Sequence, residues 1–207
     1  MARVVLVRHG ETDWNREGRL QGWAPVPLNE TGQTQAVAAG EYLAGEYDVD
    51  AVYTSDLLRA EQTTELLLET AGANDVPVTA EPAWRERHLG VYQGLTYEDA
   101  EDRFPRFALS ESAYEAAAAT PESGESLHDV ADRVTTRFEE VVDARDGETV
   151  LVVSHGGPIH VVLGHVKGMS LPDALADHHQ ANCAVNEIVV EDGDRPRVAR
   201  ENDTDWG

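Results

Sequence analysis

The chain has 207 residues, a length that suits one α/β domain carrying an insertion. Its 39 acidic residues outnumber its 16 basic residues and give a formal net charge of −23. Nucleic acids and anionic membranes would be repelled by this charge, so we expect neither as a partner. The start of the chain lacks a basic-then-apolar signal segment, and no apolar stretch approaches the roughly 20 residues of a membrane span. We therefore expect a cytoplasmic protein.

The balance of charged and sulfur-containing residues adds two expectations. Lys167 is the only lysine, and an acid-rich, lysine-poor surface suits a cytoplasm with molar salt, where the Debye length falls to about 3 Å. We therefore expect a salt-adapted host. Cys183 is the only cysteine, which excludes an intrachain disulfide and a cysteine-based metal cage. We expect it to be a small buried packing residue.

Five short segments rich in aliphatic and β-branched residues predict β-strands. They are residues 3–7, 51–54, 76–80, 150–154 and 185–190. The first and the fourth show no alternation of apolar and polar residues, which is typical of strands covered on both faces in a parallel sheet.

Helical spacing of apolar residues predicts helices between these strands. The helical segments are 31–44, 57–71, 127–142 after an N-cap at Ser126, and a fourth helix that follows Pro158. Strands that alternate with helices indicate a mostly parallel sheet with helices on both sides. The acidic stretch 96–125 interrupts this order and predicts short helices that form a lid or flank. The polar tail 193–207 predicts a frayed end or a segment along the surface.

Two histidines follow two of the buried strands directly. His9 comes after the apolar run 4–7, and His155 comes after the apolar run 150–153. Ligands of parallel sheets bind beyond the carboxyl ends of the strands, so both histidines would enter one crevice if their strands are neighbours. Each lies beside a glycine that allows close approach of the backbone to a ligand. The pattern favours a site for chemistry on an anion.

Other roles for these histidines stay open at this point. They could be hydrogen-bonded core residues or metal ligands. A transition metal needs three or four convergent ligands. The pairs His155 with His160 and His178 with His179 lack carboxylates at a recognisable spacing, so we expect no metal and no cofactor.

Five sequence pieces together resemble the histidine phosphatase superfamily, the phosphoglycerate mutase-like enzymes. The pieces are Arg8-His9-Gly10-Glu11-Thr12 with Asn15, Arg19-Leu20-Gln21-Gly22-Trp23, Ser55-Asp56-Leu57-Leu58-Arg59-Ala60, Arg85-Glu86-Arg87 and Ser154-His155-Gly156-Gly157. The likeness covers nearly the whole chain in the order of the family. It implies a three-layer α/β sandwich with a mostly parallel central sheet and helices on both faces. It also implies one domain over residues 1–207, with a lid or flanking insert at about 96–125.

The resemblance assigns roles that suit the chemistry of each residue type. His9 would be the nucleophile, because a neutral imidazole can form a phosphoramidate at physiological pH. A backbone acceptor near Gly10 would hold the proton on its other ring nitrogen. Arg8 and Arg59 carry planar forks that can clamp phosphate oxygens by paired hydrogen bonds. His155 would add a further donor to the developing charge.

Other residues are expected to contact the substrate. By resemblance these are Asn15, Gln21, Gly22 and Gly156. A small phosphorylated molecule is the only partner that we expect, and the oligomeric state is left open, a homodimer included.

Glu86 is the expected general acid and base. A carboxyl group beside a bound dianion favours its protonated form, so it can protonate the leaving oxygen and later deprotonate water. Glu11 and Glu81 are alternatives that the motif alignment disfavours. The aromatic residues Trp14, Trp23, Phe104 and Phe107 are expected to pack rather than to stack on substrate.

The insert distinguishes the branches of the family. Mutases carry a longer, basic insert after the acid, whereas residues 96–125 are short and mostly acidic, with Arg103 and Arg106 as the only cations. This favours a phosphoric monoester hydrolase of the histidine acid-phosphatase type, and disfavours multiply anionic substrates. The alternatives are a 2,3-bisphosphoglycerate-dependent phosphoglycerate mutase and a non-catalytic phospholigand-binding module. Pro25 and His160 depart from the residues that many relatives have, which leaves substrate specificity open.

Overall fold

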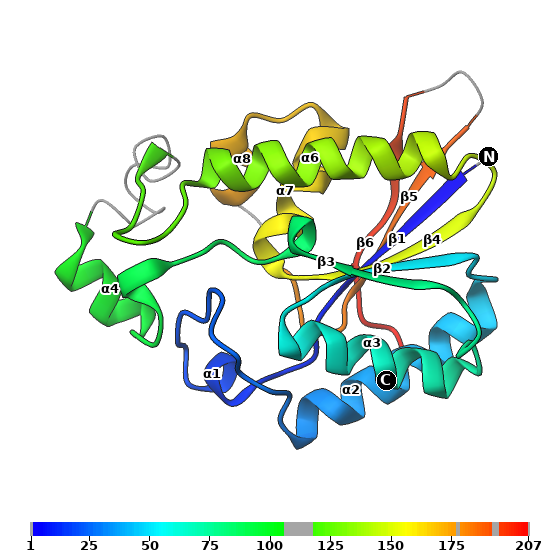
Figure 1. The fold of residues 1–207 in the computed structure, drawn as a ribbon, viewed down its shortest axis with the longest axis horizontal. Coiled ribbons are helices and arrows are strands. Elements are labelled where there is room, and N and C mark those ends of the chain that lie inside the picture. The colour runs from blue at the N-terminus through cyan, green and yellow to red at the C-terminus, as the bar shows by residue number, and fades with distance from the viewer. Residues whose placement is uncertain (1, 106–117, 177–178, 192–194, 207) are drawn as a thin grey trace.

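The computed structural model describes residues 2–105, 118–176, 179–191 and 195–206. Its centre is a six-stranded sheet in the order β3-β2-β4-β1-β5-β6 (Figure 1). The strands are β1 (Ala2–Arg8), β2 (Ala51–Ser55), β3 (Val78–Glu81), β4 (Thr149–Ser154), β5 (Val185–Val190) and β6 (Arg197–Asp203). The pairs β3–β2, β2–β4 and β4–β1 are parallel, and β5 runs antiparallel to both β1 and β6. The prediction of a mostly parallel sheet is confirmed.

Helices cover both faces of this sheet, as Figure 1 shows. On one face, α2 (Glu30–Glu46) and α3 (Leu58–Ala71) pack against the side chains of Val5, Val7 and Leu151. On the other face, α6 (Leu127–Ala144) and α7 (Gly156–Lys167) pack against Val4, Leu6 and Val152. Because neighbouring strand residues point to opposite faces, the unbroken apolar runs feed two hydrophobic cores at once. The three-layer sandwich is confirmed.

Local signals set the ends of the long helices. Ser126 caps α6 through a capping box with Asp129, as its place before the apolar pattern predicts. Gly72 ends α3 in the left-handed conformation, with φ of 66°. The helix expected after Pro158 begins two residues earlier, at Gly156, and Pro158 lies in its first turn. Cys183 is buried, as expected.

Several short elements were not anticipated. They are α1 (Asp13–Arg16), the 3-10 turns η1 (Pro82–Trp84) and η2 (Gly90–Tyr92), and α8 (Leu171–Ala176). In the insert, α4 (Tyr97–Arg103) begins at the cap Thr96, which agrees with the expected short helices. Arg106, Phe107 and Tyr114 lie outside the described residues, and so does His178.

The prediction for the tail is wrong over Arg197–Asp203. This segment is β6, an edge strand that pairs with β5 through an irregular register. It was missed because an edge strand needs little apolar surface, and its residues alternate only between exposed and partly buried. The third strand is also displaced, to Val78–Glu81 instead of 76–80.

The topology brings both motif histidines to one end of the sheet. Arg8 is directly opposite Ser154 in the parallel β1–β4 register, so His9 and His155 leave neighbouring strands at the same level. In Figure 1 these strand ends point toward α1 and α4. Among the described helices, none combines the length and apolar character needed to cross a membrane.

Candidate active site

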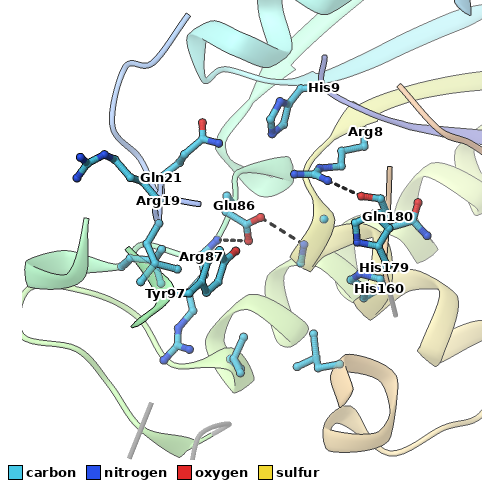
Figure 2. Close-up of a pocket in the computed structure, with 17 residues that line it drawn as sticks. Arg8, His9, Arg19, Gln21, Glu86, Arg87, Tyr97, His160, His179 and Gln180 are labelled. Atoms are coloured by element: carbon cyan, nitrogen blue, oxygen red, sulfur yellow. Dashed lines mark hydrogen bonds between the residues drawn. The ribbon is translucent and has the colours of Figure 1, made fainter. Parts of the chain in front are cut away.

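A cavity of about 330 Å³ opens at the carboxyl ends of β1 and β4 (Figure 2). Six of the residues predicted from the sequence line it: Arg8, His9, Gln21, Gly22, Glu86 and Gly156. Arg59, His155 and Asn15 are not among its described lining residues. Arg59 and His155 lie directly behind His9, where 1% and 0% of their surfaces are exposed. The site therefore has one set of residues that lines the cavity and a second, buried set, Arg59 and His155, that supports His9 from behind.

His9 presents one ring nitrogen as a nucleophile. Its Nδ1 lies 2.7 Å from the carbonyl oxygen of Gly10, and because a carbonyl only accepts, Nδ1 carries the proton. Nε2 therefore carries the lone pair, and it accepts a hydrogen bond from Arg59 Nε at 3.2 Å. The expected backbone acceptor is present, and the ring is fixed in the tautomer that attack through Nε2 requires.

Burial and two neighbouring cations keep this histidine neutral. Desolvation, followed by Arg59 and Arg8, lowers the pKa of His9 well below its ordinary value of 6.5. A neutral imidazole is the nucleophilic form. The two guanidinium groups therefore help to keep His9 in its nucleophilic form.

Arg8 is held by the chain segment before β5. Its Nη1 donates to the carbonyl oxygen of Gln180, and its Nε is buried without a partner among the described residues. Burial lowers the pKa of Arg8, whereas the nearby Glu86 carboxylate raises it. Figure 2 shows its guanidinium directed between His9 and Gln180. The unpartnered Nε is a donor that an oxyanion can use.

Arg59 reaches the site from the first turn of α3. Its Nη2 donates to the carbonyl of Gly22 at 2.9 Å, and its Nη1 donates to the carbonyl of Ala24 at 3.3 Å. Burial lowers the pKa of Arg59 to about 10, so the group stays charged at neutral pH. It links the 20–24 loop to His9.

His155 lies beside His9, with ring centroids 5.1 Å apart. Its Nε2 is 2.8 Å from the hydroxyl of Ser55, at the end of β2. Its Nδ1 is buried without a partner among the described residues. Desolvation, followed by Arg59, lowers the pKa of His155 well below 6.5, so this imidazole is neutral too.

Glu86 enters the cavity from the loop after η1. One carboxylate oxygen accepts from the backbone N–H of Arg87 at 2.8 Å, and the other accepts from the N–H of Gly157 at 3.3 Å (Figure 2). The second bond comes from the first turn of α7, where the helix dipole favours a negative group. The carboxylate is thus fixed across the cavity from His9.

The backbone of Glu86 is held as firmly as its side chain. Its carbonyl accepts from the indole N–H of Trp23 at 2.7 Å and from Arg133 at 3.1 Å. Arg85 stacks over the Trp23 ring at 4.3 Å and pairs with Asp56 at 2.6 Å. Trp23 therefore supports the acid loop, which agrees with its expected packing role.

The alternative acids are occupied elsewhere. Glu11 accepts from the side chain of Asn29, and Glu81 accepts from Trp84 and pairs with Arg137. Neither is among the described residues that line the cavity. Glu86 is the carboxylate that the fold brings to the site.

Asn15 is not among the described residues that line the cavity. Its Oδ1 accepts from the backbone N–H of Thr12 at 3.1 Å and completes the capping box of α1. Asn182 Nδ2 lies 3.5 Å from the same oxygen and donates to the carbonyl of His9 at 2.9 Å. The oxygen end of the amide is thus used in the cap, and only the nitrogen end could reach a phosphate.

Several cavity residues were not expected at the site from the sequence. They include Arg87, Leu127, Tyr97, Leu175, His179 and Gln180. Tyr97 is 61% exposed at the first position of α4, and Gln180 reaches the site only because β5 lies beside β1. Within the described ranges, no three His, Cys, Asp or Glu side chains group as a metal site would require.

Comparison with known proteins identifies the family. The model of the histidine phosphatase superfamily (branch 1) matches residues 4–204. The chain belongs to the histidine phosphatase superfamily. A relative within this superfamily, the metal-independent phosphoserine phosphatase of Arabidopsis thaliana, is 36% identical over 93% of this chain and 78% of its own length.

The chain is also similar to a mutase and to a phosphatase of solved structure. The 2,3-bisphosphoglycerate-dependent phosphoglycerate mutase 2 of Gloeobacter violaceus is 38% identical over 92% of this chain and 91% of its own length. A mycobacterial glucosyl-3-phosphoglycerate phosphatase in complex with VO3 superposes with a TM-score of 0.82. It is 33% identical and covers 97% of this chain and 98% of its own. Similar histidine phosphatases thus include both phosphoric monoester hydrolases and mutases.

Proposed function

We propose that this protein hydrolyses small phosphomonoesters through a phosphohistidine intermediate on His9, without a metal. One observation carries the proposal: His9, with its proton held on Nδ1, lines one cavity together with Arg8 and the carboxylate of Glu86. A nucleophile, an oxyanion clamp and a proton donor are the parts that phosphoryl transfer needs.

In the first step, His9 Nε2 attacks phosphorus in line with the leaving alkoxide. The N–P bond forms and the ester P–O bond breaks. Glu86, in its protonated form, gives its proton to the leaving oxygen. Arg8 and His155 donate hydrogen bonds to the other phosphoryl oxygens, where negative charge develops. Arg59 Nε joins them, because the His9 lone pair that it contacts is used in the attack.

In the second step, the Glu86 carboxylate takes a proton from water as the water oxygen attacks phosphorus. The N–P bond breaks, inorganic phosphate leaves, and the Nε2 lone pair of His9 returns. The side-chain oxygen of Gln21 is buried and has no partner among the described residues. It lines the cavity and can accept the second hydrogen of that water.

The leaving-group side of the cavity favours esters without a second anionic group. Its walls carry Leu20, Leu89, Leu127, Leu175 and Tyr97. Two arginines also line it, but their guanidinium groups are bonded to the protein. Arg19 donates to Gly94 and pairs with Glu17, and Arg87 donates to two backbone carbonyls.

The rival activity is phosphoglycerate mutase, for which one relative is named. A mutase must hold the carboxylate of phosphoglycerate and exclude water. The two arginines that line the cavity, Arg19 and Arg87, already donate to the protein, and the leucines beside them offer no partner for that carboxylate. Rapid interconversion of 3- and 2-phosphoglycerate that outpaces phosphate release would favour the mutase. Tight phosphate binding without turnover of any monoester would favour a non-catalytic module.

The proposal is tested by hydrolysis of p-nitrophenyl phosphate in molar KCl with EDTA present. We expect turnover that the chelator leaves unchanged and that His9→Ala abolishes. Loss of activity with EDTA would indicate a metal enzyme, and full activity of His9→Ala would remove the nucleophile.

We further propose that the enzyme works in a salt-rich cytoplasm. The support is the net charge of −23 with a single lysine, which molar salt would screen.

A further inference from the structure

The buried hydroxyl of Ser55 has no role in the chemistry described so far. It lies at the carboxyl end of β2, with 0% of the residue exposed, and its Oγ is 2.8 Å from Nε2 of His155. β2 is the neighbour of β4, so the sheet itself brings this hydroxyl to the histidine that follows β4.

The hydrogen bonds of Ser55 determine where its own proton points. A serine hydroxyl has one donor and two lone pairs. One lone pair accepts from the backbone N–H of Leu57 at 3.3 Å. Among the residues that the structure describes, the acceptor within reach of the hydroxyl proton is Nε2 of His155. The hydroxyl therefore donates to the ring.

Because His155 is neutral, the hydrogen bond from Ser55 decides which of its two ring nitrogens carries the proton. His9, directly after β1, and Ser55 on β2 contact its ring. The charged groups that act on it from the surrounding elements are Arg59 on α3, Arg8 on β1 and Arg133 on α6. Burial and these cations lower the pKa of His155, so the ring is neutral and has a single N–H. A neutral imidazole donates from one nitrogen only, and the tautomer decides which one.

We propose that Ser55 is a positioning residue that fixes His155 in its Nδ1–H tautomer, and so turns a neutral imidazole into a hydrogen-bond donor for the phosphoryl group on His9. This inference rests on the proposed function of the site. Nδ1 is the ring nitrogen without a partner among the described residues, in a ring 5.1 Å from that of His9.

The opposite tautomer leaves two groups unsatisfied. If Nε2 carried the proton, the Ser55 oxygen would accept from both Nε2 and Leu57, and its own hydrogen would have no acceptor among the described residues. The Nδ1 lone pair would then meet the negative oxygens of the phosphoryl group. A buried polar group without a partner is costly, so the arrangement with Ser55 as donor is favoured.

The direct test is the ¹⁵N spectrum of the histidine rings in the full-length protein saturated with inorganic phosphate. The signals of His155 are assigned from their loss in His155→Gln. We expect His155 to be neutral with its proton on Nδ1. A neutral Nε2–H ring in the phosphate-loaded wild type would overturn the inference. This measurement needs no turnover, so it can fail or succeed independently of the proposed hydrolase activity.

Substitutions test the same point through catalysis. Ser55→Ala should lower kcat about 10- to 100-fold on p-nitrophenyl phosphate. This is the range known for loss of the hydrogen-bond partner that orients a metal-ligating histidine, and Ser55 orients His155 in the same way. KM should change little, and the ring of His155 should lose its single tautomer. Ser55→Thr keeps the hydroxyl and should restore both the rate and the Nδ1–H signal.

Thr54→Val is the matched control. It deletes a buried hydroxyl one residue away, which contacts Thr64 and the carbonyl of Ser55 instead of a histidine. This variant should keep the kcat and the Nδ1–H signal of the wild type. Equal loss of kcat in Thr54→Val and Ser55→Ala, with an unchanged tautomer in both, would contradict a positioning role.

Discussion

At the scale of single residues, Gly157 determines whether the Glu86 carboxylate can enter the site. A methyl group at Gly157 would lie 2.4 Å from Oε1 of Glu86, closer than any ordinary contact. The N–H of the same residue holds the other carboxylate oxygen at 3.3 Å. Gly157 thus leaves room for the Glu86 carboxylate and also donates a hydrogen bond to it.

Gly157→Ala should therefore displace the proton donor without harming the fold. We expect hydrolysis of an alkyl phosphate, which has a poor leaving group, to slow about 10- to 100-fold, because a positioned acid supplies ~10²–10⁴ in rate. Hydrolysis of p-nitrophenyl phosphate should slow much less. Steady-state kinetics on both esters and a thermal melt are the measurements.

Gly45→Ala is the control for this substitution. Gly45 is also a helical glycine, but a methyl group there meets nothing within 4 Å. Alanine should stabilise α2 by up to about 1 kcal/mol and leave both rates unchanged. Equal losses on good and poor leaving groups in Gly157→Ala would argue against Glu86 as the proton donor.

The sequence predicts the reactive residues better than the residues that hold them. His9 and His155 directly follow strands, so their convergence follows from the strand order, whereas Glu86 was predicted from the resemblance of its motif to the family. Ser55 and Gln180 reach their active-site partners, His155 and Arg8, through contacts that only the packed sheet creates. Asn15 stays a predicted phosphate contact, since its oxygen caps α1 and its Nδ2 is the end that could donate to a phosphate.

At the scale of elements, β5 and β6 support Arg8, the proposed phosphate clamp. The amide of Asn186 on β5 forms two hydrogen bonds with the amide of Gln180 and accepts from the backbone N–H of Asn202 on β6. The carbonyl of Gln180 in turn accepts from Arg8. A polar network, buried at Gln180 and Asn186, therefore connects the edge of the sheet to the active site.

Asn186→Leu should disturb both stability and the clamp. It leaves the Gln180 amide and the Asn202 N–H unpaired, which should cost about 2–4 kcal/mol in the free energy of unfolding. We also expect at least a tenfold lower kcat/KM where the variant is fully folded, because Arg8 loses its support. Denaturant unfolding and kinetics at the same temperature check both.

The control for Asn186→Leu is Val189→Ala on the same strand. Val189 is buried at the far end of β5, opposite Arg3. It should lose about 2 kcal/mol of stability but keep kcat/KM. If both variants lost kcat/KM equally, the link from Asn186 to Arg8 would be wrong.

The elements that the sequence predicts are those with a strong apolar pattern. β1 and β4 are unbroken aliphatic runs, and α6 has an apolar stripe behind a Ser126 cap. β6 was missed because Arg197–Asp203 is polar and pairs at an edge, where backbone hydrogen bonds rather than burial stabilise a strand.

At the scale of the whole molecule, two buried neutral histidines make stability depend on pH. The pKa values of His9 and His155 are lowered in the folded state, so below pH 6.5 the unfolded chain binds protons that the folded chain does not. Stability is therefore complete above about pH 6.5 and falls as the pH decreases. The loss should approach about 1.4 kcal/mol per pH unit for each histidine.

Chemical unfolding between pH 5 and 7 in constant molar KCl measures this dependence. The lowered pKa values of Asp56 and Asp129 act only below their ordinary value of 3.8, outside this window. The double variant His9→Gln/His155→Gln should flatten the curve. A steep slope that survives in the double variant would show that other groups titrate.

The surface charge predicts a dependence on salt. Glu61, Glu65 and Glu69 are exposed and follow one another at i, i+4 spacing along α3, so like charges repel on one face of the helix. The melting temperature should rise by several degrees between 0.1 and 2 M KCl, as the Debye length falls to about 3 Å or less. Replacing these three residues by Gln should raise the melting temperature at 0.1 M KCl and shrink the rise. An unchanged melting temperature of the wild type across this range would refute salt adaptation.

The central claim is that a phosphoryl group passes through His9, and trapping that group tests it most directly. Glu86→Gln should accumulate the intermediate from p-nitrophenyl phosphate, because the leaving group departs without help while water lacks its base. After rapid quenching under alkaline conditions, tandem mass spectrometry should find one acid-labile phosphoryl group, on His9. Phosphate on another residue, or turnover with no covalent phosphoenzyme in either Glu86→Gln or the wild type, would contradict the account.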